Sequence, residues 1–184
     1  IKIRVKKPAV IEIFPGPGNL RRAISKASSG STIRLAGAIY EIEKSIKVEK
    51  EITIEGASDG STMLKSMEDL DSPFMYFFKV TEGGKLRMKN LTLDALDQNA
   101  IKYALTSPSE NESEPYSIYA DNCIFQNFKT KNGGSIFKAY VGTKADTLSF
   151  TNTRFENSYR GLNLSYDKDN ICLLYTSDAA DDGI

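Results

Sequence analysis

Six basic and aromatic side chains between positions 138 and 160 have the chemistry needed to bind an acidic polysaccharide: Lys138, Tyr140, Lys144, Arg154, Tyr159 and Arg160. Tyrosine rings stack on sugar faces, and lysine or arginine pairs with sugar carboxylates. The last three follow the first three by about one structural repeat of the chain, so we predict one substrate-binding strip on one sheet. Outward strand positions are also commonly lysine, arginine or tyrosine for solubility alone, and this alternative stays open.

Acidic side chains offer two further candidates. Glu110, Glu112 and Glu114 alternate within residues 107–115, and carboxylate oxygens suit calcium. Their spacing matches no known calcium loop, so the acidic, serine- and proline-rich composition favours a solvated loop, and no metal site is predicted. Asp94 and Asp97 are a close carboxylate pair near a strand end, of the kind an inverting glycoside hydrolase needs, but this spacing alone is weak support.

The sequence contains no histidine. This excludes Ser-His-Asp catalysis, Cys-His catalysis and histidine-ligated zinc within the chain. Cys123 lies on an alternating strand, and we expect a small core or turn residue there, because a nucleophilic thiol needs an activating base. Lys44, Lys47, Lys50 and Lys65 are expected to form a solvated face. No catalytic residue is predicted.

Charge and hydropathy limit the partners. The chain has 24 lysine and arginine residues and 24 aspartate and glutamate residues. A nucleic-acid-binding domain concentrates positive charge on one face, so no nucleic acid partner is predicted. No run of residues is long and apolar enough to span a bilayer, so no membrane span is predicted. A length of 184 residues suits one domain.

Both ends of the sequence suggest a fragment of a longer protein. Residues 172–182 match one translated reading frame of a synthetic sequencing-library adapter, and we expect residues 172–184 to be an artefact rather than natural sequence. A natural, polar, disordered tail is the alternative. Without these residues, 24 basic residues face 21 acidic ones, and Cys123 is left without a disulfide partner. The chain begins at Ile1, so we expect residues to be missing before it.

Hydrophobic periodicity predicts one short helix followed by many strands. Leu20, Ala23, Ile24 and Ala27 form one apolar stripe at helical spacing, so a helix is expected over residues 19–27, with Asn19 as its N-cap. From Ile33 onward the apolar period becomes two. The strands are short, and the polar residues between them leave no room for crossover helices.

Three segments repeat one pattern around an asparagine: residues 86–93, 118–125 and 148–155. Asn90, Asn122 and Asn152 are therefore 32 and 30 residues apart. Residues 52–56 fit the same frame, with Gly56 in the place of the asparagine. Asparagine and glycine tolerate the left-handed backbone conformation of a tight turn, so the three asparagines are predicted to form a structural turn ladder.

A period of about 30 residues without helices predicts an all-β fold, a right-handed single-stranded parallel β-helix with a short N-terminal capping helix. Equivalent apolar side chains should form two ladders inside it: Leu86, Ile118 and Leu148, and Leu93, Phe125 and Phe155. The helix should cap the first coil, because an open end would expose strand edges and core. We expect the β-helix domain over residues 18–171, and an interdomain linker or the end of a preceding domain over residues 1–17.

Two parts of the sequence resemble bacterial polysaccharide-degrading enzymes. The succession of the helix and residues 31–35, 40–42, 46–48 and 52–56 looks like the opening coil of β-helix polysaccharide lyases. Residues 137–138, 145–157 and 162–169 resemble the second, C-terminal β-helix domain of two-domain enzymes in polysaccharide lyase family six. That family contains alginate lyases and the chondroitinase B type. The resemblance covers about residues 9–171.

The resemblance implies β-elimination of a uronic acid polysaccharide, either alginate or dermatan or chondroitin sulfate. In the family, calcium neutralises the uronate carboxylate, a lysine removes the neighbouring proton, and an arginine lies near the leaving oxygen. These residues belong to the first β-helix domain, and this sequence has no matching set. The chain is therefore expected to be a non-catalytic domain, inactive alone and without a cofactor, with calcium in the missing catalytic domain.

The resemblance also implies an acidic polysaccharide and an upstream catalytic β-helix domain of the same chain as partners, and a periplasmic or secreted location. Two alternatives remain open. The first is a glycan-binding or adhesin-like β-helix module with no enzymatic activity. The second, weaker one is a pectin-type lyase or hydrolase acting within this domain.

Overall fold

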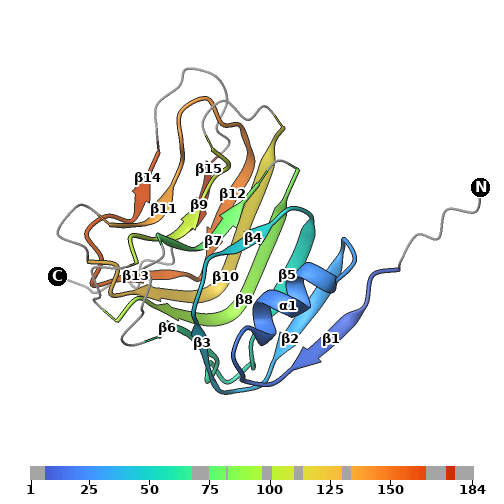
Figure 1. Ribbon diagram of the computed structural model, residues 1–184. Helices are drawn as coiled ribbons and strands as arrows, with labels where there is room; N and C mark the ends of the chain where they lie inside the picture. Colours follow the sequence, from blue (N-terminus) through green and yellow to red (C-terminus); the bar gives the residue numbers. More distant parts are fainter. Residues whose placement is uncertain are drawn as a thin grey trace, which may run out of the picture.

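The chain folds into a parallel β-solenoid (Figure 1). This computed structural model describes residues 7–67, 75–81, 83–96, 101–109, 114–129 and 134–164, together with the backbone of residues 173–176. Every strand pair in that part of the chain is parallel. The predicted parallel β-helix with one short helix near its N-terminal end is confirmed.

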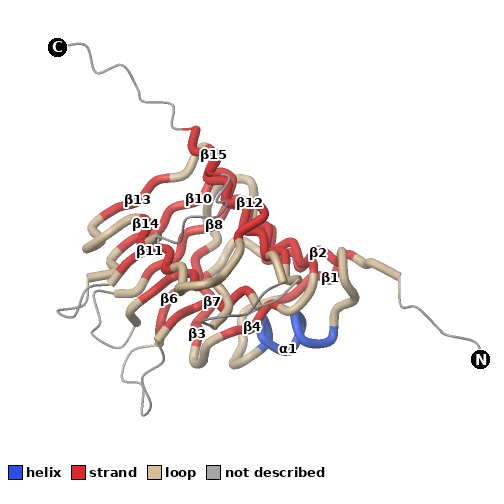
Figure 2. The backbone as a smooth tube through the Cα atoms, turned by 90° about the horizontal axis from the view of Figure 1, so that it is seen from above, coloured by secondary structure: helices blue, strands red, loops and turns tan. Residues whose placement is uncertain are grey.

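Two sheets form the wall of the solenoid (Figures 1 and 2). The long sheet has the order β1 (Val10–Ile13), β2 (Ser31–Leu35), β5 (Glu51–Glu55), β8 (Lys85–Asp94), β10 (Tyr116–Gln126), β12 (Ala145–Thr151) and β15 (Leu173–Thr176). It continues through β3 (Ile39–Ile42), β6 (Met63–Ser66) and β13 (Arg154–Glu156). The short sheet has the order β4 (Ile46–Val48), β7 (Tyr76–Val80), β9 (Tyr103–Thr106), β11 (Ser135–Lys138) and β14 (Leu162–Asn163).

The strands β8 and β10 each pass from one set of partners to another within a single strand. Residues 85–89 of β8 pair with β5, whereas residues 92–94 pair with β6. The strand β10 likewise pairs with β12 before Asn122 and with β13 after it. The repeated asparagine therefore marks the corner where the chain leaves one face of the solenoid for the next.

Equivalent side chains stack inside the solenoid as ladders. Ile52, Leu86, Ile118 and Leu148 are register partners, and all four are fully buried. Complete burial of such a side chain stabilises a fold by about 1.5–3 kcal/mol. In the second ladder Leu93, Phe125 and Phe155 are register partners, with 5.8 Å between the two phenylalanine rings. Both predicted inward ladders are confirmed.

The helix α1 (Asn19–Lys26) covers the core at the N-terminal end of the solenoid (Figure 1). Leu20, Ile24 and Ala27 are buried and belong to the same apolar cluster as the strand ladders. Tyr40 fastens β1 to the first coil, because its hydroxyl donates a 2.9 Å hydrogen bond to the carbonyl of Ile13. The helix thus lies where the sequence predicted it.

The predicted N-cap of this helix is wrong. Gly18 takes the cap position, with φ 65°, and no side chain caps the helix. Asn19 is inside the helix, where its amide nitrogen donates to the carbonyl of Phe14 and its amide oxygen accepts from Arg22. Glycine adopts the left-handed conformation without steric cost, so the turn before the helix places the boundary one residue earlier than the capping preference of asparagine suggests.

Gly56 also differs from the prediction. It does not have the left-handed conformation found at the asparagines of the later coils. A Cβ atom at Gly56 would lie 2.2 Å from the backbone oxygen of Asn90 and 2.9 Å from side-chain atoms of Leu91 and Thr62. Close backbone approach, rather than a positive φ, therefore requires glycine at this position.

Two of the four lysines predicted to be solvated have structural contacts. The ammonium group of Lys50 donates to the carbonyls of Ser25 (3.0 Å) and Ala27 (2.7 Å) at the C-terminal end of α1. Lys65 is half-buried and lies 3.5 Å from a carboxylate oxygen of Glu41. Lys44 and Lys47 are exposed as expected.

Both segments beyond the predicted domain contribute a strand. Val10–Ile13 form β1, which pairs in register with β2, inside the predicted linker of residues 1–17. Leu173–Thr176 form β15 on the edge of β12, inside the segment interpreted as adapter-derived. Neither pairing tests where these residues come from, so both interpretations stay predictions. No helix in the described part of the chain combines the length and apolarity needed to cross a membrane.

Candidate functional site

Lys138 and Tyr140, the first two predicted sugar-binding residues, lie together at the end of β11. The Lys138 ammonium group is 5.8 Å from the centre of the Tyr140 ring. The backbone N–H of Tyr140 donates to the hydroxyl of Ser107, and its phenolic oxygen lies 4.0 Å from the sulfur of Met75. Tyr140 therefore contacts neighbouring residues through its backbone N–H and its phenolic oxygen, and it offers a half-buried ring beside a cation.

Tyr159 and Arg160 form a second cation–aromatic pair just before β14. The guanidinium carbon of Arg160 lies 5.3 Å from the centre of the Tyr159 ring. Both residues are exposed, and 59% of Tyr159 is accessible to solvent. The backbone carbonyl of Arg160 accepts from the N–H of Ile136 at the start of β11, so the pair lies at the opposite end of the short sheet's strands from Lys138.

Lys144 and Arg154 lie elsewhere. Lys144 is exposed just before β12, and its carbonyl accepts from the N–H of Tyr116 in the long sheet. Arg154 lies on β13 and makes a 3.1 Å ion pair with Glu156. The six residues therefore do not share one sheet as the sequence analysis expected. They form two cation–aromatic pairs at opposite ends of the strands β11 and β14, with two separate basic residues.

Asn90, Asn122 and Asn152 all have the left-handed backbone conformation, with φ of 55°, 51° and 49°. The Asn122 side chain donates to that of Asn90 at 2.8 Å, but Asn152 donates instead to the carboxylate of Asp121 at 3.2 Å. Hydrogen bonds along this column therefore change partner between coils. The contacts of the three side chains hold neighbouring turns together.

A second column of turns was missed by the sequence analysis. Leu96, Asn127 and Asn157 have φ of 55°, 65° and 46°, and the amide of Asn157 donates to Asn127 at 2.6 Å. Asn127 and Asn157 are 30 residues apart, which is also the distance between Asn122 and Asn152. That shared spacing was a usable signal, but Leu96 in the earlier coil conceals it.

Asp94, one member of the predicted carboxylate pair, is 6% exposed and accepts three hydrogen bonds. Its donors are the backbone N–H of Leu96 at 2.7 Å and the side-chain amides of Gln126 and Asn127 at 2.7 and 2.8 Å. These bonds fasten the turn at the end of β8 to the next coil, a structural role. Asp97 lies outside the described residues.

The acidic candidates do not assemble into a site in the described part of the chain. No three histidine, cysteine, aspartate or glutamate side chains gather there in a way that could hold a metal ion. Glu114 is exposed, and Glu110 and Glu112 lie outside the described residues.

Comparison with solved structures finds the same architecture in a polysaccharide-degrading enzyme. The chain is similar to a PL6 family alginate lyase, AlyGC, with a TM-score of 0.73 and 19% identity over 86% of this chain and 22% of that chain. A mutant of AlyGC gives a TM-score of 0.71 and 18% identity over the same shares. This likeness shows the fold. No family model and no curated protein matches the chain.

Cys123 is not available as a nucleophile. It is 1% exposed, and burial raises the pKa of its thiol to about 12. The thiol therefore stays protonated at neutral pH, and only the thiolate attacks as a nucleophile. The expected role as a small core residue agrees with its place in the apolar cluster.

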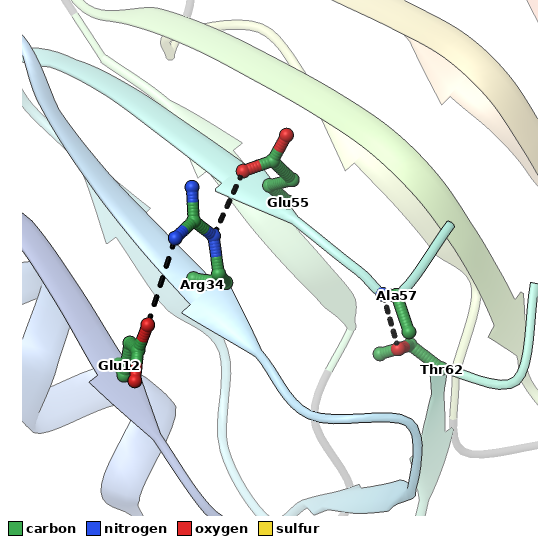
Figure 3. A network of polar contacts seen from close by, with 5 residues as sticks. All are labelled: Glu12, Arg34, Glu55, Ala57 and Thr62. Carbon is green, nitrogen blue, oxygen red and sulfur yellow. Dashed lines mark hydrogen bonds and ion pairs between the residues drawn. The ribbon is translucent and has the colours of Figure 1, made fainter. Parts of the chain in front are cut away.

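The outer surface of the long sheet carries charges that compensate one another. Arg34 lies between two carboxylates, at 3.5 Å from Glu12 and 3.2 Å from Glu55 (Figure 3). Arg87 pairs with Glu51 at 3.4 Å and lies 4.0 Å over the ring of Tyr119. These side chains bind each other, which suits a solvated wall better than a ligand site.

Proposed function

We propose that this chain is a non-catalytic β-helix module of a bacterial polysaccharide lyase that cleaves a uronic acid polysaccharide by β-elimination. The observation that carries this proposal is the fold likeness to an alginate lyase, which extends over 86% of this chain but only 22% of the lyase. If the parent protein is as long as the lyase, the rest of it is long enough to contain a separate catalytic domain.

The chemistry of the described residues supports a non-catalytic role. Elimination needs a group that neutralises the uronate carboxylate and a base near the neighbouring C–H. Asp94 is fully engaged in hydrogen bonds, and the thiol of Cys123 is protonated. The arginines Arg34, Arg87 and Arg154 are each paired with a carboxylate.

The N-terminal end of the solenoid offers a surface for an upstream domain of the same protein. A depression of about 420 Å³ lies between β1 and α1, lined by the apolar side chains Ile11, Ile13, Phe14 and Ala23 and by the polar side chains Glu12, Asn19, Arg22 and Lys26. Phe14 is 70% exposed and Val10 is 57% exposed. Exposed apolar surface of this kind favours contact with another folded unit. We assign the calcium site, the catalytic residues and export from the cytoplasm to the longer protein that would contain both this chain and the upstream domain.

The test is an ultraviolet assay for the unsaturated uronate that elimination produces, with alginate and dermatan sulfate as substrates. The 184-residue chain is compared with the same gene extended upstream of Ile1. We expect activity in the extended protein and none in the chain alone. Activity in the chain alone would place catalysis within this module, and inactivity of both would contradict the lyase assignment.

The second candidate is a glycan-binding module without an enzymatic partner. The exposed pair of Tyr159 and Arg160 favours it, because an accessible ring beside a guanidinium group suits an acidic sugar. Glycan binding by a protein whose upstream sequence has no lyase activity would support this alternative.

A further inference from the structure

Three lysines occupy one register row of the short sheet. The row consists of the register partners Lys47, Lys79, Thr106, Lys138 and Asn163, one from each of β4, β7, β9, β11 and β14. Lys47 points outward, because it is exposed whereas its neighbours Ile46 and Val48 are buried. We call these five positions the lysine row.

The lysine row differs in charge from the matching row of the long sheet. There, the register partners Glu12, Arg34, Glu55, Lys89 and Asp121 alternate in sign from strand to strand. The lysine row contains three cationic positions and no acidic one. The two rows belong to the same solenoid, so the solenoid fold itself does not require a row whose charged positions are all basic.

Like charges directly opposite each other on neighbouring strands are destabilising. Lys47 and Lys79 are such a pair, on strands that lie about 4.8 Å apart. Selection for stability alone favours alternation, as in the long sheet. A ligand that brings one negative charge for each step along the solenoid axis would offset the repulsion, and an extended polyuronate chain carries one carboxylate on every sugar.

Two features beside the lysine row suit a sugar ligand: the Tyr140 ring and a depression next to Lys47. Tyr140 lies beside Lys138 and reaches Met75, the residue before β7, so an aromatic ring lies next to the basic positions. Thr106 is fully buried, so Lys79 and Lys138 flank a covered position rather than a continuous strip. Beside Lys47 a depression of about 360 Å³ opens between β4 and α1, lined also by Arg21 and Glu49.

We propose that the outer face of the short sheet binds an anionic polysaccharide, with Lys47, Lys79 and Lys138 contacting the acid groups of sugars spaced along the solenoid axis. This inference rests on the proposed function for the choice of a polysaccharide as ligand. It adds Lys47 and Lys79, which the sequence analysis did not select, to Lys138 and Tyr140. Nucleic acid is the less favoured ligand, because the chain as a whole carries equal numbers of basic and acidic residues.

The experiment is an affinity measurement on the 184-residue chain and two matched double variants. Lys47→Gln with Lys79→Gln removes two charges from the lysine row. Lys85→Gln with Lys89→Gln removes two charges from β8 in the long sheet and is the control. The probes are alginate, dermatan sulfate, neutral dextran, polyglutamate and a thymidine oligonucleotide, and thermal melting checks that each variant is folded.

We expect the lysine-row variant to bind alginate or dermatan sulfate about tenfold more weakly than the unchanged chain, and the control to differ by less than about twofold. Preference for alginate would identify carboxylates as the bound groups, and preference for dermatan sulfate would identify sulfates. Equal weakening in both variants, absence of polysaccharide binding, or equal binding of polyglutamate or the oligonucleotide would overturn the inference.

These outcomes are separable from those of the lyase assay. Lyase activity of the extended protein, with no effect of the lysine-row substitutions on binding, overturns the surface and leaves the proposed function intact. Binding through the lysine row, with an inactive extended protein, supports the surface and overturns the lyase assignment.

Discussion

The side-chain amide of Asn122 donates a 2.8 Å hydrogen bond to the side-chain oxygen of Asn90, its counterpart one coil earlier. Both residues have the left-handed backbone conformation at the same corner of the solenoid. One residue type thus provides both the turn and the contact between turns. Neighbouring coils are therefore coupled at their corners as well as through their strands.

Replacing Asn122 by leucine should destabilise the fold by about 2 kcal/mol. A left-handed leucine costs about 1–2 kcal/mol, and the lost hydrogen bond adds about 1 kcal/mol. Urea unfolding measures this change. Asn122→Gly is the control, because glycine keeps the backbone conformation and loses only the hydrogen bond. Equal stability of the leucine variant and the unchanged chain would contradict a structural role, and affinity for any glycan should not change.

Gly56→Ala should be more destabilising than Gly60→Ala. The new Cβ at position 56 would lie 2.2 Å from the Asn90 carbonyl oxygen, so the backbone of one coil must move. At Gly60 there is open space, and the cost comes only from φ 76°, about 1–2 kcal/mol. Thermal melting of the two variants gives the comparison. Equal melting temperatures would show that close approach at position 56 is unimportant.

Lys50→Met should loosen α1 and lower the free energy of unfolding by about 1 kcal/mol. The Lys50 ammonium group bonds the carbonyls of Ser25 and Ala27, where a cation also interacts favourably with the helix dipole. Hydrogen exchange of the α1 amides measures the local effect. The exposed Lys44→Met is the control, and faster exchange in both variants would argue against a specific cap.

Stability should fall as the pH rises above about 9. Burial raises the pKa of Cys123 from 9.0 to about 12 and that of Tyr116 from 10.0 to about 12. The folded chain therefore holds these protons more tightly than the unfolded chain, and the associated stability is present at lower pH and lost between about pH 9 and 12. Urea unfolding at increasing pH tests this.

Cys123→Ala is the diagnostic variant for that pH dependence. It should flatten the part of the curve between about pH 9 and 10, where the unfolded thiol titrates before the unfolded tyrosine. In the unchanged chain, a thiol reagent at pH 8 should label Cys123 only after unfolding. The chain also contains Cys172, so the labelled residue is identified by peptide mapping, and rapid labelling of Cys123 in the folded chain would contradict the burial of this thiol.

The β-helix could be predicted because each coil repeats the same pattern of residue types at a spacing of about 30 residues. The alternation of apolar residues defines the strands, and the spacing of Asn90, Asn122 and Asn152 defines a coil. The inward ladders follow from these two signals. The cap helix followed from its apolar stripe, although Gly18 rather than Asn19 forms its N-terminal boundary.

The surface could not be predicted in the same way. Residues become neighbours across coils through strand register, and the loops between strands differ in length. Arg154 follows Lys144 closely in the chain but lies on β13, paired with Glu156. Lys47, Lys79 and Lys138 are 32 and 59 residues apart, which is one coil and about two coils, but Thr106 at the intermediate coil interrupts the series of lysines. From the sequence, Lys47 was therefore expected on a solvated face, and Lys79 was not selected as a binding residue.

The same register has a consequence for how this molecule can change during evolution. Hydrogen bonds between parallel strands hold Lys47, Lys79 and Lys138 in line, whatever the length of the chain between them. Insertions and deletions in the loops can therefore accumulate without moving the row. A deletion inside β7 would instead turn Lys79 inward and an apolar neighbour outward. The loops of the solenoid can therefore change in length and sequence during evolution, while the register partners on neighbouring strands remain aligned.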